Sequence, residues 1–214
     1  MATHVHGPPL SKADRLRLGR RARVLAGASV AYNVVEAVVA VTAGVVAGSV
    51  ALIGFGLDSV VEVSSGVIVL WQFRHRLPES REAQALRLMA LSFFVLAAYV
   101  TFASVRALLE GTAPAESPVG IGLAVASLVV MPFLAWAQRR TGRALGSNAV
   151  VAGSTQALLC TYLSAVLLAG LVLNATLGWG WSDAVAGLVI AAVAVREGLA
   201  AWRGESCCST GCAD

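Results

Sequence analysis

Apolar residues dominate the chain in long runs, and the breaks between the runs are short and polar. Dividing the runs at Gly, Pro, Ser and charged residues gives six helix candidates, at residues 24–46, 50–73, 88–109, 119–137, 149–177 and 179–195. A helix needs about 20 residues to cross about 30 Å of hydrocarbon, and most of the candidates reach this length. The fifth is long enough to tilt or to project into water, and the sixth is short.

These runs predict helices, because a backbone inside a lipid bilayer must satisfy its own hydrogen bonds. We therefore expect an all-α fold, an integral membrane bundle of six transmembrane helices. Residues 1–23 form a basic N-terminal segment, residues 24–203 form the transmembrane domain, and residues 204–214 form a short tail that contains Cys. The connections between the candidates are too short for a separate soluble domain.

The basic residues indicate how the bundle lies in the membrane. Every Lys and Arg except Arg106 falls before the first candidate, between the second and third, between the fourth and fifth, or after the sixth. The loop Glu110–Pro118, on the other side, is acidic, and Trp179 and Trp181 fit an interfacial aromatic belt. Because basic loops stay in the cytoplasm, both termini are expected there.

The composition agrees with a membrane protein and excludes other classes. Apolar and aromatic residues make up 57% of the chain and charged residues 13%, whereas a soluble domain has about 25% charged residues. A disordered chain or a water-soluble globule is excluded, and the basic residues serve topology rather than a nucleic-acid partner. The Ala-, Val-, Gly- and Arg-rich usage with almost no Lys favours a bacterial plasma membrane.

Sequence motifs for catalysis are missing. The chain has no His-Glu-x-x-His, no set of Ser, His and Asp, and no nucleotide-binding glycine loop. We therefore expect neither an enzyme nor a permanent cofactor. An exporter of organic cations would need more aromatic residues around its cavity than the 7% present here.

Three acids lie within the predicted spans without a basic partner. Glu36 is in the first span, and Asp58 and Glu62 are in the second, with no Lys, Arg or His at the same depth. An ionised side chain at the centre of a bilayer costs about 3 kcal/mol or more and is usually paired. These acids must therefore be neutralised by protons, by a bound cation, or by each in turn.

Helical spacing brings the candidate ligands together in pairs on common helix faces. The pairs are Asp58 with Glu62, Asn33 with Glu36, and Gln156 with Cys160. If the three helices pack together, these side chains supply oxygen and sulfur donors around one point. A divalent ion such as Zn²⁺ binds about four such ligands at about 2.0–2.3 Å.

Structural explanations stay open for each of these residues. Asp58 and Glu62 can form a protonated pair that only bonds across helices, and Asn33 with Glu36 can do the same. Cys160 can be a small buried apolar residue. A further acid, Asp183, can cap the start of the sixth helix near water.

The residues from Tyr32 to Glu62 resemble the first two spans of the cation diffusion facilitator family. In that family a Ser-x-Ala-Leu segment precedes an Asp with a second acid four residues later, which corresponds here to Ser49–Leu52, Asp58 and Glu62. The last two predicted spans, with Asp183 in a Trp-x-Asp stretch, resemble a bacterial branch. The resemblance implies six-span exporters of Zn²⁺ and related ions that exchange metal for protons, commonly as homodimers.

The chain departs from that family in its fifth span, which has neither the usual His nor an acid. Either Gln156 and Cys160 replace those ligands, or the site is weakened. The second acid of the pair is Glu62 rather than an Asp. The sequence also stops soon after the sixth span, which we interpret as a branch that lacks the C-terminal cytoplasmic domain.

The resulting hypothesis is a divalent-cation transporter, with Zn²⁺ as the main candidate and proton-coupled efflux as the mechanism. Its expected partners are the lipid bilayer, the cation and protons. The alternative is a non-transporting structural or regulatory bundle with a degenerate metal site. The tails carry potential soft ligands, which either collect metal for the bundle or do not bind it: His4, His6, Cys207, Cys208 and Cys212.

Overall fold

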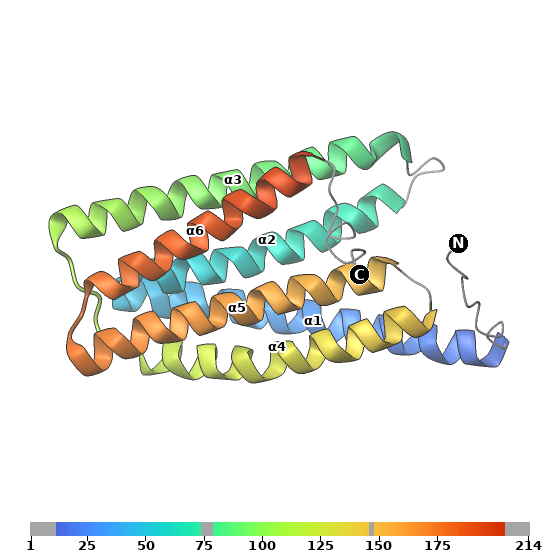
Figure 1. The fold of residues 1–214 in the computed structure, drawn as a ribbon, viewed down its shortest axis with the longest axis horizontal. Coiled ribbons are helices and arrows are strands. Elements are labelled where there is room, and N and C mark those ends of the chain that lie inside the picture. Colours follow the sequence, from blue (N-terminus) through green and yellow to red (C-terminus); the bar gives the residue numbers. More distant parts are fainter. Residues whose placement is uncertain (1–11, 74–78, 146–147, 204–214) are drawn as a thin grey trace, which may run out of the picture.

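The computed structural model describes residues 12–73, 79–145 and 148–203, without the side chains of 12, 15, 65–73, 79–83, 85 and 148–153. This part of the chain forms long helices and no strand. The helices are α1 (Lys12–Ala47), α2 (Val50–Phe73), α3 (Glu79–Glu110), α4 (Pro118–Leu145), α5 (Asn148–Leu177) and α6 (Trp181–Trp202). They lie side by side, and successive helices run in alternating directions (Figure 1). The expected all-α fold is confirmed for the described residues.

The helix bounds agree with the predicted spans at one end of the bundle and extend beyond them at the other. The bounds of α2 match the prediction and those of α5 agree with it to one residue. By contrast, α1, α3, α4 and α6 continue past it at the end that carries the arginines. Hydropathy marks only the part of a helix that lies in hydrocarbon. The extra turns carry basic side chains that reach water, so a search for apolar runs could not find them.

Five described helices are long and apolar enough to cross a membrane, and the chain is a multi-pass membrane protein. The qualifying segments are Leu16–Ala47, Leu86–Glu110, Pro118–Leu145, Ser154–Leu177 and Trp181–Trp202. Residues 65–73 of α2 lie outside the described side chains. A sixth span and the cytoplasmic position of both termini therefore stay predictions.

Two layers of apolar packing hold the helices together. Residues of α1, α2, α4, α5 and α6 form the main core, in which Phe55, Met131 and Leu167 are fully buried. A second cluster, which includes Leu96 and Val100 of α3, joins α3 and α6 to α2. Helix α2 thus contributes to both clusters, and its polar residues lie at the centre of the bundle.

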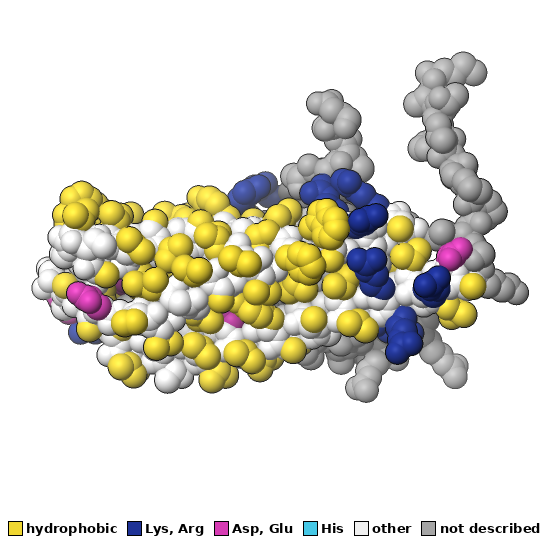
Figure 2. Space-filling model, turned by 90° about the horizontal axis from the view of Figure 1, so that it is seen from below, with side chains coloured by type: hydrophobic (Ala, Val, Ile, Leu, Met, Phe, Trp, Pro, Cys, Tyr) yellow, Lys and Arg dark blue, Asp and Glu magenta, His cyan; other side chains and the backbone are white. Residues whose placement is uncertain are grey.

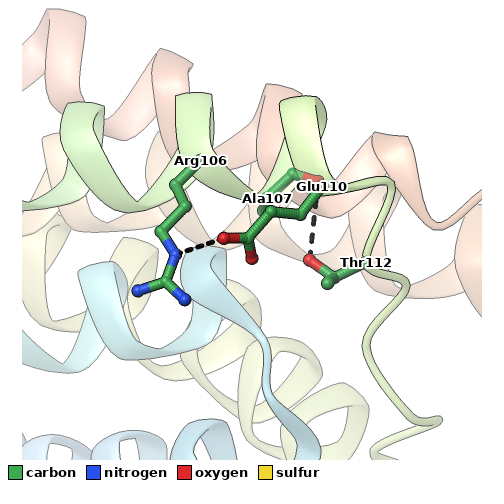
Figure 3. Close-up of polar contacts among 4 residues, drawn as sticks. All are labelled: Arg106, Ala107, Glu110 and Thr112. Atoms are coloured by element: carbon green, nitrogen blue, oxygen red, sulfur yellow. Dashed lines mark hydrogen bonds and ion pairs between the residues drawn. The ribbon is translucent and has the colours of Figure 1, made fainter.

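Apolar and charged side chains occupy different parts of the outer surface, as expected for a membrane protein. Figure 2 shows apolar side chains over the length of the bundle and Lys and Arg gathered toward one end, where α1, α3 and α5 begin. We call this the basic end. At the opposite end, in the last turn of α3, the Nε of Arg106 donates to the Glu110 carboxylate at 2.7 Å. Thr112, which follows the helix, donates to the carbonyl of Ala107 (Figure 3).

Candidate functional site

Glu36 of α1 is 1% exposed, and its carboxylate accepts hydrogen bonds from three other helices. Ser59 of α2 donates at 2.7 Å, Ser127 of α4 donates to the second oxygen, and the Cys160 thiol of α5 donates at 3.5 Å. The hydroxyl of Tyr32 lies 2.7 Å from that of Ser127. We call these five residues the Glu36 cluster. It satisfies a buried carboxylate with neutral donors only.

Glycines allow α1 and α2 to approach closely beside this cluster. A Cβ added at Gly56 would lie 2.9 Å from the Cβ of Ala40, and one added at Gly44 would lie 2.8 Å from the backbone nitrogen of Ile53. Neither position has room for a side chain. Small residues of this kind let helix backbones meet inside a membrane, and here they bring the polar faces of α1 and α2 together.

The second-span acids lie next to this cluster and have fewer partners. Asp58 is 7% exposed and accepts no hydrogen bond from a described residue. Glu62 is partly buried and accepts one, from the amide nitrogen of Asn33 at 2.5 Å. The carboxylates of Asp58, Glu62 and Glu36 interact electrostatically with one another, and Glu197 of α6 also acts on Asp58. No described basic side chain forms an ion pair with Asp58, Glu62 or Glu36.

Asn33 donates to Glu62 and keeps one polar atom unpaired. Its side chain is 6% exposed, and its Oδ1 has no hydrogen-bond partner among the described residues. Asn33 lies about one turn from Glu36 on the same helix. A buried amide oxygen without a donor is rare in folded proteins. This oxygen belongs to the side chain that donates to the Glu62 carboxylate.

The structure divides the candidate ligands between two groups. Asn33 lies with Glu62, and Glu36 lies with Cys160. Gln156 is partly buried and makes no hydrogen bond to a described residue. In the described part of the chain, no three His, Cys, Asp or Glu residues are arranged so that they could hold a metal ion. Helix α5 therefore brings Cys160, but not Gln156, into contact with an acid.

Sequence reasoning missed the hydroxyl groups of this site. Ser59, Ser127 and Tyr32 complete the Glu36 cluster, yet none of them was a candidate. Ser127 is an isolated polar residue in the apolar run of α4, and Ser59 directly follows Asp58. Both could have been found by asking which donors can reach a buried carboxylate.

Asp183 has a structural role that differs from the predicted one. Its carboxylate accepts hydrogen bonds from the Ser49 hydroxyl at 2.5 Å and from the backbone nitrogens of Val50 and Ala51 at 2.8 and 3.3 Å. Helix α6 itself begins after Gly180 without a side-chain cap. The interpretation of Asp183 as a cap of its own helix is therefore wrong, because the residue caps the first turn of α2.

Comparison with known proteins decides the family. The cation efflux transmembrane domain matches residues 88–203, more than half of the chain. The chain belongs to the cation diffusion facilitator family. The matched part contains Cys160 and Asp183, whereas Asn33, Glu36, Asp58 and Glu62 precede it. Members of this family are transporters of metal cations rather than enzymes.

One curated relative is named as a transporter. The chain is 26% identical over 148 residues to the uncharacterized transporter sll1263 of Synechocystis sp.. The alignment covers 64% of this chain and 48% of the relative. The chain thus spans about half the length of the curated relative that it matches.

Proposed function

We propose that this protein transports a divalent metal cation, with Zn²⁺ as the main candidate, and that Asp58 and Glu62 bind it. The observation that carries the proposal is the state of Asp58. This residue is 7% exposed, and its carboxylate accepts no hydrogen bond from a described residue and has no described basic partner. A cation that visits the site would neutralise both acids of α2, which lie one turn apart on one face.

Asn33 supports a ligand set that extends to α1. Its unpaired Oδ1 adds an uncharged oxygen beside the Glu62 carboxylate. Two carboxylates and one amide oxygen give three ligands from α1 and α2, and Zn²⁺ binds about four. Cys160, Gln156 or a water molecule would supply the fourth. A thiolate from Cys160 would favour softer ions such as Zn²⁺ over Mg²⁺ or Mn²⁺.

Proton exchange follows from the chemistry of the ligands. A carboxylate or thiol must lose its proton before it coordinates a metal, so protons leave as the cation binds. Rocking of the bundle would expose the site to each side in turn, with protons returning after the cation leaves. Efflux from the basic end, a bacterial plasma membrane and a homodimeric assembly complete the proposal, and they are taken from the topology of the basic residues, the composition and the family.

The test is zinc uptake into proteoliposomes with a zinc-sensitive dye inside and a pH gradient across the membrane. We expect uptake by the parent protein and its loss in Asp58→Asn, which keeps the size of the side chain but removes the charge. Glu116→Gln is the matched control, since Glu116 is an exposed acid in the connection between α3 and α4. An Asp58→Asn variant that takes up zinc as fast as the parent would refute the proposal.

A non-transporting bundle is the second candidate. It is favoured by the lack of three grouped ligands of the His, Cys, Asp and Glu type in the described residues. Under this alternative, purified protein binds zinc weakly or not at all, and the dye inside the proteoliposomes reports no zinc uptake. Binding measured by calorimetry together with uptake separates the two candidates.

A further inference from the structure

Two adjacent residues at the start of α6 bond to both helices that carry the proposed second- and fifth-span ligands. Asp183, which is 2% exposed, accepts three hydrogen bonds from Ser49 and the first turn of α2. The Ser182 hydroxyl lies 2.9 Å from the carbonyl oxygen of Gly170 on α5 and 2.6 Å from that of Trp179. We call Ser182 and Asp183 the α6 clasp.

Asp183 holds α2 by a complementarity of charge as well as by hydrogen bonds. The first backbone N–H groups of a helix have no partner within the helix, and they carry the positive end of its dipole. Ser49 is the N-terminal cap, because its hydroxyl oxygen also accepts from the Leu52 nitrogen at 3.1 Å. Together these bonds fix the position of the first turn of α2 and its rotation about the helix axis.

Helix α2 transmits this fixed position to the acids. It runs without a break from Val50, so Asp58 lies about 12 Å further along the axis. Close packing leaves α6 little freedom to slide. A Cβ added at Gly187 would clash with the Ser104 hydroxyl of α3, and one added at Gly170 would lie 2.9 Å from the Cβ of Ala186 on α6.

We propose that the α6 clasp positions α2 and α5 relative to each other and thereby sets the affinity of the cation site. Asp183 is then a positioning residue and not a ligand, since both of its carboxylate oxygens already have donors. This inference rests on the proposed function, because the quantity that the clasp controls is the binding of the transported cation by Asp58, Glu62 and their partners.

The experiment measures the zinc dissociation constant of purified protein by calorimetry and the KM and maximal rate of uptake in proteoliposomes. Asp183→Ser removes the carboxylate, and we expect the dissociation constant and KM to rise about tenfold, the lower end of the range for residues that orient metal ligands. The maximal rate per folded protein should stay within about twofold of the parent. Size-exclusion and unfolding in the absence of metal give the folded amount.

A swapped pair tests positioning directly. In the double variant Ser49→Asp with Asp183→Ser, an aspartate caps α2 and a hydroxyl on α6 donates to it, so the contact is restored with its partners exchanged. We expect the dissociation constant to return to within about threefold of the parent. If Asp183 itself binds the cation, the swap does not restore affinity, and the inference is overturned.

The remaining outcomes are also decisive. Asp183→Ser protein that folds and binds zinc as tightly as the parent overturns the inference, as does a loss of uptake that only follows the loss of folded protein. Should Asp183→Ser not fold, Ser49→Ala removes the donor to Asp183 together with the cap of the Leu52 nitrogen, and a raised or unchanged dissociation constant then supports or overturns the clasp. A parent protein that neither binds nor transports zinc refutes the proposed function, which is a different result.

Discussion

Two buried aspartates, one packed against α2 and one within it, differ in the number of hydrogen bonds that they accept. Asp183 lies against the N-terminus of α2 and accepts three hydrogen bonds there. Asp58 lies about two turns further along α2 and accepts none from the described residues. Both carboxylates are enclosed in an apolar bundle. Burial of an acid is therefore no sign of an ion site by itself, and the count of available donors distinguishes a structural acid from one that awaits a cation.

Two glutamates extend this comparison, since Glu36 accepts as many hydrogen bonds as Asp183 and Glu62 lies between Asp183 and Asp58. Glu36 accepts hydrogen bonds from three neutral donors on α2, α4 and α5, so this residue of α1 connects four helices. Glu62 accepts one donor, from Asn33. Of these four acids, the two on α2 have the fewest donors, and one of them accepts from Asn33, whose oxygen is unpaired. Asp58 and Glu62 are therefore less well satisfied by hydrogen bonds than Glu36 and Asp183.

The largest expected effect comes from Asp58→Asn. We expect zinc uptake to fall at least about 100-fold, because one of the two carboxylates of the proposed site is gone. The free energy of unfolding should stay the same or rise, since a neutral amide is easier to bury than a carboxylate without a partner. Uptake assays and unfolding in SDS titrations measure the two effects. A destabilised Asp58→Asn protein would show that Asp58 has structural partners after all.

Asp183→Asn should give the reverse pattern in stability. The amide oxygen can still accept from the backbone nitrogens of α2, but the negative charge and the acceptor of the Ser49 hydroxyl are lost, so we expect a loss of about 2 kcal/mol in the free energy of unfolding. The same SDS titration measures it, with Glu116→Gln as a control at an exposed acid. An unchanged stability would mean that the first turn of α2 does not depend on α6, and it would remove the contrast with Asp58.

The sequence was sufficient for the helices but not for the roles of the acids. Apolar runs and basic breaks predicted the all-α bundle, and residues 50–73 were placed correctly because α2 starts and ends where its hydropathy changes. The bounds of α5 also agree with the prediction to one residue, whereas α1, α3, α4 and α6 run on past their apolar runs, where no apolar signal marks them. The family resemblance is confirmed by the match to residues 88–203.

Contacts between distant residues are what the sequence could not give. Asp183 and Ser49 are separated by 134 positions, and Ser127 and Glu36 by 91. Helical spacing identifies residues on one face of one helix, but it does not say which other helix that face meets. For this reason the pairing of Asn33 with Glu36 was sound as spacing, while their separate partners, Glu62 and Cys160, appeared only in the structure.

Asn33→Leu tests whether the unpaired oxygen matters. The leucine has a similar volume but supplies no oxygen, and we expect the KM for zinc to rise about tenfold. Asn174→Leu is a matched control, because Asn174 lies at the far end of α5 and donates to the carbonyl of Pro114. Equal KM values for Asn33→Leu and the parent would place the cation away from α1.

Cys160→Ser tests the fifth-span contribution with a smaller expected effect. The serine hydroxyl still donates to Glu36, so the Glu36 cluster should persist, but the soft sulfur is lost. We expect the preference for Cd²⁺ over Mn²⁺ to fall several-fold while the rate with Mn²⁺ changes little. Competition uptake assays with the two ions measure this ratio. An unchanged ratio would assign Cys160 to packing and hydrogen bonding alone.

Glu110→Gln should have the smallest effect, and it compares the interior acids with an exposed one. Glu110 is exposed and pairs with Arg106 at the opposite end from the arginine-rich surface (Figure 3). Because water solvates both members of such a pair, we expect neither zinc uptake nor the unfolding midpoint to change. A fall in uptake would show that charge at this end of the bundle acts on the cation from a distance. In that case the count of hydrogen-bond donors would not be enough to separate functional acids from structural ones.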